Sequence, residues 1–240
     1  MANEVILSLQ GVDSGYGDIE VLHDISFEVT RGDIVSVLGA NGAGKSTLMK
    51  TIFGILTPTN GEIGYKGQRI NGKPSVQLLN MGISFLPEGR SNFPAMTVEE
   101  NLEMGGYTLQ DQNELRNRIK MLFERFPILF EKRNVEAGNL SGGQQQILEI
   151  AMALMLKPEI ILIDEPTLGL APILVTEVFQ IIQEIQKTGT TVILVEQNAK
   201  RALEISDYAI VLELGKIRIQ GKASELAQES ALIAAYLGER

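Results

Sequence analysis

The residues with the clearest chemistry lie in a glycine-rich stretch, residues 39–47, which reads Gly-Ala-Asn-Gly-Ala-Gly-Lys-Ser-Thr. This spacing matches a P-loop, in which glycines let successive backbone N–H groups turn toward a phosphate and the following helix adds its positive end. Lys45 would neutralise the β and γ phosphates, and the Ser46 hydroxyl would bind Mg²⁺. The alternative is a glycine-rich turn that binds nothing. The stretch therefore predicts a site for ATP and Mg²⁺, with Gly39, Asn41, Gly42, Gly44, Lys45, Ser46 and Thr47 around the phosphates.

Two carboxylates, Asp164 and Glu165, follow the apolar run Ile160–Ile163. Burying charges at a strand end is costly unless a cation or water occupies the sheet edge. Neighbouring residues of a strand point to opposite faces, so the two side chains can have different roles. We expect Asp164 to bind Mg²⁺, directly or through water, and Glu165 to act as general base on the attacking water. Solvated carboxylates that merely end a strand are the alternative.

Buried strands and helices must position these groups. Residues 34–38 form an apolar strand that runs into the glycine-rich stretch, and a helix is expected from about Lys45. Residues 160–163 and 192–195 are two further apolar strands, joined by a helix, and this order returns the chain to a parallel sheet. The buried face of that helix is predicted at Val178, Ile181, Ile182 and Ile185.

Other segments predict a β-rich part and a helical part. Apolar residues alternate at Ile25, Phe27 and Val29, and residues 62–70 resemble a short antiparallel strand between turns at Asn60-Gly61 and Asn71-Gly72. Further along, Thr97 to Glu100 has the form of a capping box. A helical face is predicted at Leu115, Ile119, Leu122 and Phe126.

The predicted fold class is α/β. A P-loop core with a mixed or parallel sheet is expected, together with an antiparallel β subdomain and an α-helical subdomain inserted at about residues 92–156. Residues 1–240 are expected to form a single domain, with a short helix near its end, around Ala223 to Leu237.

The string Leu140-Ser141-Gly142-Gly143-Gln144 distinguishes this chain from other P-loop proteins. Ser141 and Gln144 can form a capping box at the head of a helix, which leaves a hydroxyl and glycine N–H groups exposed as an anion site. A plain helix cap is the alternative. The string resembles the signature motif of ABC ATPases, and that resemblance implies that Ser141, Gly142, Gly143 and Gln144 cover a nucleotide held by the P-loop of a second subunit. It therefore implies a head-to-tail dimer.

The resemblance extends to other positions along nearly the whole chain. Tyr16 stands where the family stacks an aromatic ring on adenine, although it could also be a core residue at a strand end. Most members have a glutamine where this chain has Glu88, an aspartate in place of Ala171, and a histidine in place of Gln197. Glu88 remains a candidate Mg²⁺ ligand. Gln197 is a candidate catalytic residue that can hydrogen-bond phosphate or water but does not titrate.

These departures are similar to those in the smaller ATPase of branched-chain amino acid importers. The resemblance implies an ATP-hydrolysing subunit that works with a second ATPase subunit, transmembrane permease subunits and, through them, an extracytoplasmic solute-binding protein. Such a subunit would lie peripherally at the cytoplasmic face of the cell membrane. A urea or short-chain amide importer, a soluble ABC ATPase outside transport, and a P-loop kinase are the alternatives.

Composition limits the partners of the chain. Its 240 residues have a formal net charge of −9, so no excess of Lys or Arg is present to follow a phosphate backbone, and nucleic acid is not an expected partner. Cysteine is absent, which excludes disulfides and thiolate metal sites. The most apolar stretch, residues 151–163, is too short and too interrupted to span a bilayer.

Overall fold

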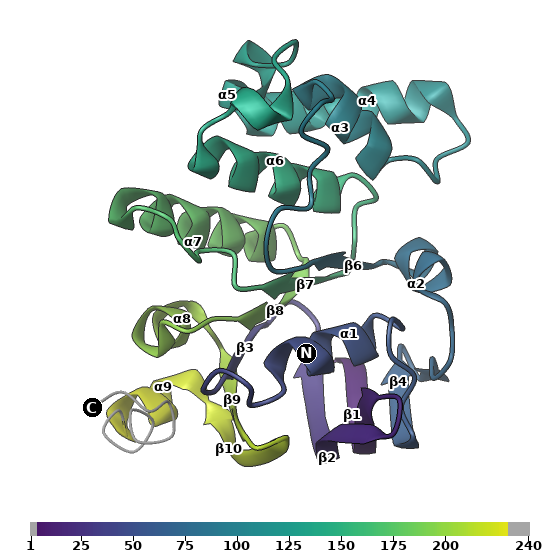
Figure 1. The fold of residues 1–240 in the computed structure, drawn as a ribbon, viewed down its shortest axis with the longest axis vertical. Coiled ribbons are helices and arrows are strands. Elements are labelled where there is room, and N and C mark those ends of the chain that lie inside the picture. Colours follow the sequence, from purple (N-terminus) through teal and green to yellow (C-terminus); the bar gives the residue numbers. More distant parts are fainter. Residues whose placement is uncertain (1–3, 230–240) are drawn as a thin grey trace.

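A six-stranded sheet carries the predicted nucleotide-binding segments, in the order β10-β9-β3-β8-β7-β6 (Figure 1). The computed structural model describes residues 4–229. Strands β9, β3, β8, β7 and β6 are parallel, and β10 pairs antiparallel with β9, so the prediction of a mixed sheet is confirmed. The strands are β3 (Ile34–Leu38), β6 (Ile83–Leu86), β7 (Ile160–Asp164), β8 (Thr191–Val195), β9 (Tyr208–Glu213) and β10 (Lys216–Lys222).

A second sheet is antiparallel throughout and has the order β2-β1-β4-β5. Its strands are β1 (Val5–Tyr16), β2 (Ile19–Thr30), β4 (Asn60–Tyr65) and β5 (Gln68–Arg69). The prediction of one strand over residues 62–70 was wrong, because Lys66 and Gly67 both have positive φ and reverse the chain into a hairpin. Asn60, predicted as a turn residue, already begins β4.

The six-stranded sheet is covered on both faces, as its uninterrupted apolar strands require. Alternate residues of β7, such as Ile161 and Ile163, pack with the helices α6 and α7. The residues between them, Ile160 and Leu162, pack toward α1 and the antiparallel sheet. Figure 1 shows these helices on opposite sides of the strands. The covering helices are α1 (Lys45–Ile52), α6 (Gly142–Leu154) and α7 (Pro172–Lys187), and α7 buries the four residues predicted for it.

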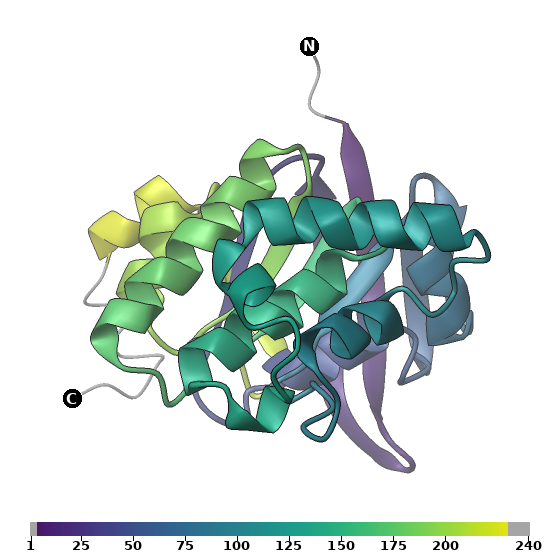
Figure 2. The same ribbon diagram turned by 90° about the horizontal axis from the view of Figure 1, so that it is seen from above.

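A helical layer lies beyond α6, and Figure 2 shows it (teal) in front of the strands. It comprises α3 (Val98–Gly105), α4 (Gln112–Arg125) and α5 (Pro127–Glu131), with a 3-10 turn at Ala137–Asn139 before α6. The capping box at Thr97 and Glu100 is confirmed. The four apolar residues predicted between residues 115 and 126 are buried. The subdomain limits of 92 and 156 remain a prediction.

Short helices complete the chain: α2 (Ser75–Met81), α8 (Ala199–Ile205) and α9 (Ala223–Leu226). Of the helix predicted over residues 223–237, the first four residues are α-helical and Ala227–Glu229 form a 3-10 turn. The remainder lies outside the described residues. Among residues 4–229, no helix has both the length and the apolar character needed to cross a membrane.

Candidate nucleotide site

The loop between β3 and α1 requires glycine at several positions. Gly42 and Gly44 have φ values of 82° and 104°, which other residues rarely adopt. A Cβ on Gly39 would lie 2.4 Å from the carbonyl oxygen of Leu212, and a Cβ on Gly44 would lie 2.9 Å from a methyl group of Leu22. The loop therefore packs directly against neighbouring strands while it turns into α1.

Lys45 is held in the centre of this loop. Its side chain is only 5% exposed, and Nζ donates hydrogen bonds to the carbonyl oxygens of Gly39 (2.9 Å) and Ala40 (3.2 Å). The same Nζ lies 3.8 Å from Oε1 of Glu165. The Lys45 side chain thus lies beside the strand end where the carboxylates gather.

A cavity of about 400 Å³ brings together residues from distant segments of the sequence. The P-loop forms one wall, and Glu88, Glu165 and Gln197 approach from the ends of three different strands. Among the predicted P-loop and carboxylate residues, Gly39 and Asp164 do not line the cavity. Val21 of β2 also lines it and had no signal in the sequence. The predicted residues that line it are Tyr16, Asn41, Gly42, Gly44, Lys45, Ser46, Thr47, Glu88, Glu165 and Gln197.

Glu165 takes its orientation from an unusual backbone. Its φ is +49°, a left-handed value that is rare for a residue with a side chain and is often found at functional sites. Its N–H donates to the carbonyl oxygen of Val195 at 3.0 Å, and Oε2 accepts a hydrogen bond from Nε2 of Gln197 at 2.6 Å. The carboxylate is therefore fixed between the Gln197 amide and the Lys45 ammonium.

Asp164 is buried next to this carboxylate. Burial raises the pKa of Asp164, a hydrogen bond with the Ser46 hydroxyl lowers it, and the nearby charges of Glu165 and Glu88 raise it further. Its Oδ1 has no hydrogen-bond partner. A carboxylate with an unpaired oxygen beside a hydroxyl fits a Mg²⁺ ion.

This ion would need further oxygens from phosphates and water. No group of three or more His, Cys, Asp or Glu side chains within residues 4–229 could hold a metal ion by itself. Mg²⁺ typically uses one or two carboxylates and completes its shell with substrate phosphates and water. The donor set is therefore suited to an ion that arrives with a nucleotide.

Two buried glutamates near the site were missed by the sequence analysis. Glu149 of α6, 2% exposed, accepts hydrogen bonds from the Ser91 N–H (3.0 Å) and from Nδ2 of Asn92 (2.6 Å). It thereby ties the loop that follows Glu88 to the helix that begins at the signature string. Burial raises the pKa of Glu149, although these hydrogen bonds lower it. The only signal was a charged residue among the apolar residues of α6.

The second missed glutamate, Glu196, follows β8 directly. Its Oε1 accepts a hydrogen bond from the Thr167 hydroxyl at 2.7 Å, and burial raises its pKa. The bond links the loop after Glu165 to the loop that carries Gln197. A carboxylate at the end of an apolar strand, the pattern that marked Asp164, was the available signal.

The signature string lies apart from this cavity. Ser141 caps α6 in the predicted capping box, with its N–H donating to Oε1 of Gln144 at 3.1 Å. A Cβ on Gly143 would lie 2.7 Å from the side chain of Leu174 of α7, so α6 approaches α7 closely at this glycine. Ser141 and Gly142 are exposed, and none of residues 141–144 lines the P-loop cavity. A single chain does not bring the two motifs together.

Tyr16 is a rim residue rather than a core residue. Its side chain is 45% exposed at the end of β1, and the ammonium of Lys50 lies 5.7 Å from the ring centroid. Tyr16 borders the same cavity as the P-loop. The alternative of a buried strand-end residue is therefore excluded.

Comparison with known proteins identifies the class to which this fold and site belong. Residues 22–168 match the family model described as ABC transporter. The chain is 45% identical over 233 residues to the high-affinity branched-chain amino acid transport ATP-binding protein BraG of Pseudomonas aeruginosa, covering 97% of this chain and 100% of that protein. The chain therefore belongs to the ABC transporter family of ATP-binding proteins, and it is an ATPase subunit.

Solved structures agree with this assignment. The ADP conformation of MJ1267, an ATP-binding cassette of an ABC transporter, has a TM-score of 0.88 and 28% identity and covers 98% of this chain and 100% of its own. The dimeric post-hydrolysis state of the cassette MJ0796 with ADP and Pi has a TM-score of 0.79 and 26% identity, covering 91% and 99%. The predicted family and fold are confirmed.

Proposed function

We propose that this protein hydrolyses ATP to drive an importer of branched-chain amino acids. The observation that carries the proposal is the 45% identity to BraG over the full length of that protein, which its printed name assigns to branched-chain amino acid transport. Glu88, Ala171 and Gln197 support the same assignment, because the resemblance to this group of importers rests on the loops that contain them.

The P-loop cavity would hold ATP. Backbone N–H groups of residues 39–47 would surround the phosphates, Lys45 would neutralise them, and Tyr16 would stack on the adenine. Ser46 and Asp164, with Glu88 at the cavity wall, would hold Mg²⁺, which supplies positive charge to the transferred phosphoryl group when bound. The volume of about 400 Å³ and the convergence of these groups on one cavity support this arrangement.

Glu165 would act as general base. A water oxygen forms a bond to the γ-phosphorus, the bond from that phosphorus to the bridging oxygen of ADP breaks, and the proton of the water passes to Glu165. Gln197 would orient the carboxylate through the bond of 2.6 Å and could hydrogen-bond the water or phosphate. Since Gln197 does not titrate, it carries no proton in this step.

The complete site would require two subunits in head-to-tail arrangement. Ser141, Gly142, Gly143 and Gln144 would contact the nucleotide held by the P-loop of the other subunit. The exposure of Ser141 and Gly142 and the separation of all four residues from this chain's own cavity support the proposal. The dimeric structure of the related cassette MJ0796 supports it as well. The second subunit would be another copy or a different ATPase.

The motion of the dimer would pass to transmembrane permease subunits at the cytoplasmic face of the cell membrane. The loop from Glu88 to Pro94 would transmit it, and the Glu149 bonds to Ser91 and Asn92 tie this loop to α6. An extracytoplasmic solute-binding protein would select the amino acid and deliver it to the permease. With a net charge of −9, the chain offers no general basis for binding nucleic acid.

Affinity purification tests the whole proposal. The Glu165→Gln variant would be purified from membranes of its own cell in Mg²⁺-ATP, and the proteins that accompany it would be identified by mass spectrometry. We expect two permease proteins, a second ATPase and an amino-acid-binding protein. A urea- or amide-binding protein instead would overturn the solute class, and recovery of soluble partners alone would overturn transport.

A further inference from the structure

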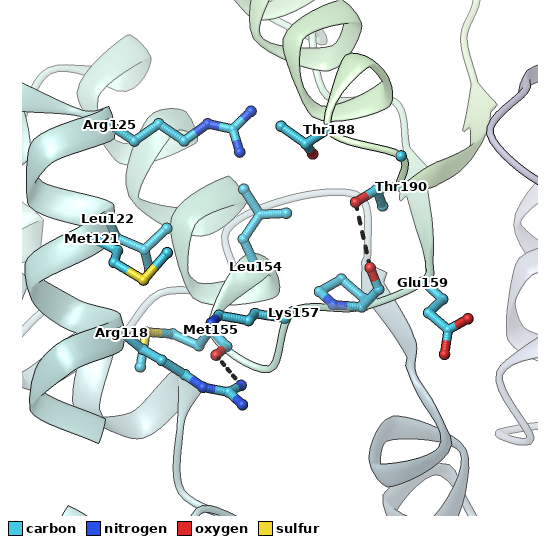
Figure 3. Close-up of a pocket in the computed structure, with 12 residues that line it drawn as sticks. Arg118, Met121, Leu122, Arg125, Leu154, Met155, Lys157, Glu159, Thr188 and Thr190 are labelled. Atoms are coloured by element: carbon cyan, nitrogen blue, oxygen red, sulfur yellow. Dashed lines mark hydrogen bonds between the residues drawn. The ribbon is translucent and has the colours of Figure 1, made fainter. Parts of the chain in front are cut away.

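A second cavity, of about 500 Å³, lies where the helical layer meets the sheet (Figure 3). Its walls come from α4, from the turn between α6 and β7, and from the turn between α7 and β8. Pro158 and Thr190 in these turns precede β7 and β8, whereas Asp164 and Gln197 stand at or beyond the opposite ends of the same strands. The cavity is therefore separate from the nucleotide site.

Three cationic side chains line this cavity: Arg118, Arg125 and Lys157. Arg118 donates to the Met155 carbonyl oxygen at 2.8 Å and pairs with Glu114, while its Nε is buried and has no hydrogen-bond partner. Arg125 is half-buried and Lys157 is exposed, and among the described residues neither has a carboxylate within ion-pair distance. A half-buried guanidinium without an acceptor is unfavourable, and a bound anion would satisfy Arg125.

The one carboxylate that lines the cavity is engaged elsewhere. Glu159 borders the cavity, but its carboxylate pairs with Arg31 at 2.7 Å and with Lys66. Figure 3 shows it directed away from the cationic groups, while the Arg125 guanidinium extends toward Thr188. Glu184 raises the pKa of Arg125 through its charge, but burial has the larger, lowering effect. Among the described residues, the guanidinium of Arg125 is thus left without an ion-pair partner.

The apolar part of the lining is aliphatic. Met121, Leu122, Leu154 and Met155 provide most of it. None of the lining residues, all of which the structure describes, is aromatic, so a nucleotide base would find no ring on which to stack. The volume lies within the range of small-molecule sites.

We propose that this cavity binds a small aliphatic carboxylate. The carboxylate accepts hydrogen bonds from Arg125, while Arg118 and Lys157 add positive charge to the cavity, and the hydrocarbon part lies on Met121 and Leu154. Such a ligand connects α4 of the helical layer to the turns that begin β7 and β8. The inference concerns a site beyond the proposed ATPase function and does not depend on the transported solute.

Isothermal titration calorimetry on the full chain tests the inference. The probes are 4-methylpentanoate, inorganic phosphate, and leucine, which adds an ammonium group beside the carboxylate of the first probe. We expect 4-methylpentanoate to bind at least about tenfold more tightly than either of the others, since phosphate lacks the apolar part and the ammonium of leucine would face the cations. Equal affinity for phosphate or leucine, or no binding of any probe, would overturn the ligand class.

Variants locate the binding. Arg125→Met keeps the length of the side chain and removes the charge, and we expect it to weaken 4-methylpentanoate binding by about tenfold or more. Lys120→Met is the matched control, because Lys120 lies on the same helix, is 77% exposed and does not line the cavity. Folding of both variants is checked by ATP binding. Unchanged affinity in Arg125→Met, or an equal loss in Lys120→Met, would overturn the proposal.

Discussion

The P-loop region and the signature region of this chain use similar elements in different surroundings. Both place glycines at a helix N-terminus, with Gly44 as the N-cap of α1 and Gly142 and Gly143 in the first turn of α6. Around the P-loop the chain gathers a buried lysine and two carboxylates into one cavity, whereas Ser141 and Gly142 face solvent. The comparison teaches that one chain assembles the charged surroundings of its P-loop by itself and leaves the head of the signature helix open to contact from outside the chain.

The largest expected effect concerns the carboxylate of Glu165 in the P-loop region. Glu165→Gln preserves shape and removes the proton acceptor, so we expect ATP hydrolysis to fall by about a hundredfold to ten-thousandfold while Mg²⁺-ATP binding is retained. Phosphate release and equilibrium nucleotide binding measure the two effects. Turnover close to that of the unmodified protein would remove Glu165 from the base role.

Mixing experiments address the two regions together. Lys45→Ala and Ser141→Ala should each nearly abolish hydrolysis, but their equimolar mixture should recover activity, because one site of the mixed dimer joins an intact P-loop to an intact signature. A mixture of Lys45→Ala and Ser46→Ala is the control and should recover none, since both variants damage the P-loop. If the first mixture also stays inactive while the variants associate, the shared-site proposal fails.

A smaller effect is expected at Glu149, whose hydrogen bonds tie the loop after Glu88 to α6 of the signature region. Glu149→Ala leaves the buried donors of Ser91 and Asn92 unpaired, which we expect to cost about 1–3 kcal/mol of unfolding free energy. It should also reduce the rate of hydrolysis, because the loop after Glu88 loses its anchor on α6. Glu149→Gln keeps an acceptor oxygen for Asn92 and should restore most of both properties. Equal defects in the two variants, measured by chemical denaturation and phosphate release, would contradict this anchoring role.

The smallest expected effect is a gain in the stability of the nucleotide-free protein when Asp164 is replaced by Asn. The pKa of Asp164 is raised in the folded protein, so the folded state binds this proton more tightly than the unfolded state. The nucleotide-free protein therefore loses stability as the pH rises from the ordinary Asp range through the raised pKa. At pH 7 we expect Asp164→Asn to have the higher Tm, by roughly 2–4 °C for each kcal/mol gained.

Two measurements complete this test. The difference in Tm should shrink in acid, where Asp164 is protonated in both states, and Mg²⁺-ATP should stabilise the unmodified protein more than the variant. A variant that melts lower than the unmodified protein at pH 7 without nucleotide would show that the Asp164 carboxylate is not destabilising in the empty site.

Local features of the site were predictable because neighbouring residues determine them. The turn at Gly42 and Gly44, the two capping boxes and the carboxylates after an apolar strand depend on a few consecutive side chains and their backbone preferences. The hairpin at Lys66 and Gly67 was missed, since lysine gives no indication of positive φ. The glutamates Glu149 and Glu196 were missed because their partners lie on other elements, and no local pattern reveals a hydrogen bond across the fold.

The amino-acid sequence by itself determined the strands β3, β7 and β8 with the helices α1 and α7, the glycine-rich turn and the family to which the chain belongs. Each follows from short-range periodicity or from residue types at fixed spacing. Only the tertiary structure decided that Glu88, Glu165 and Gln197 share a cavity with Lys45 and that residues 141–144 stay outside it. It also decided that three cations line a second cavity, at the opposite ends of the strands. These arrangements depend on which elements pack together, because packing brings residues far apart in the chain within reach of hydrogen bonds and charge.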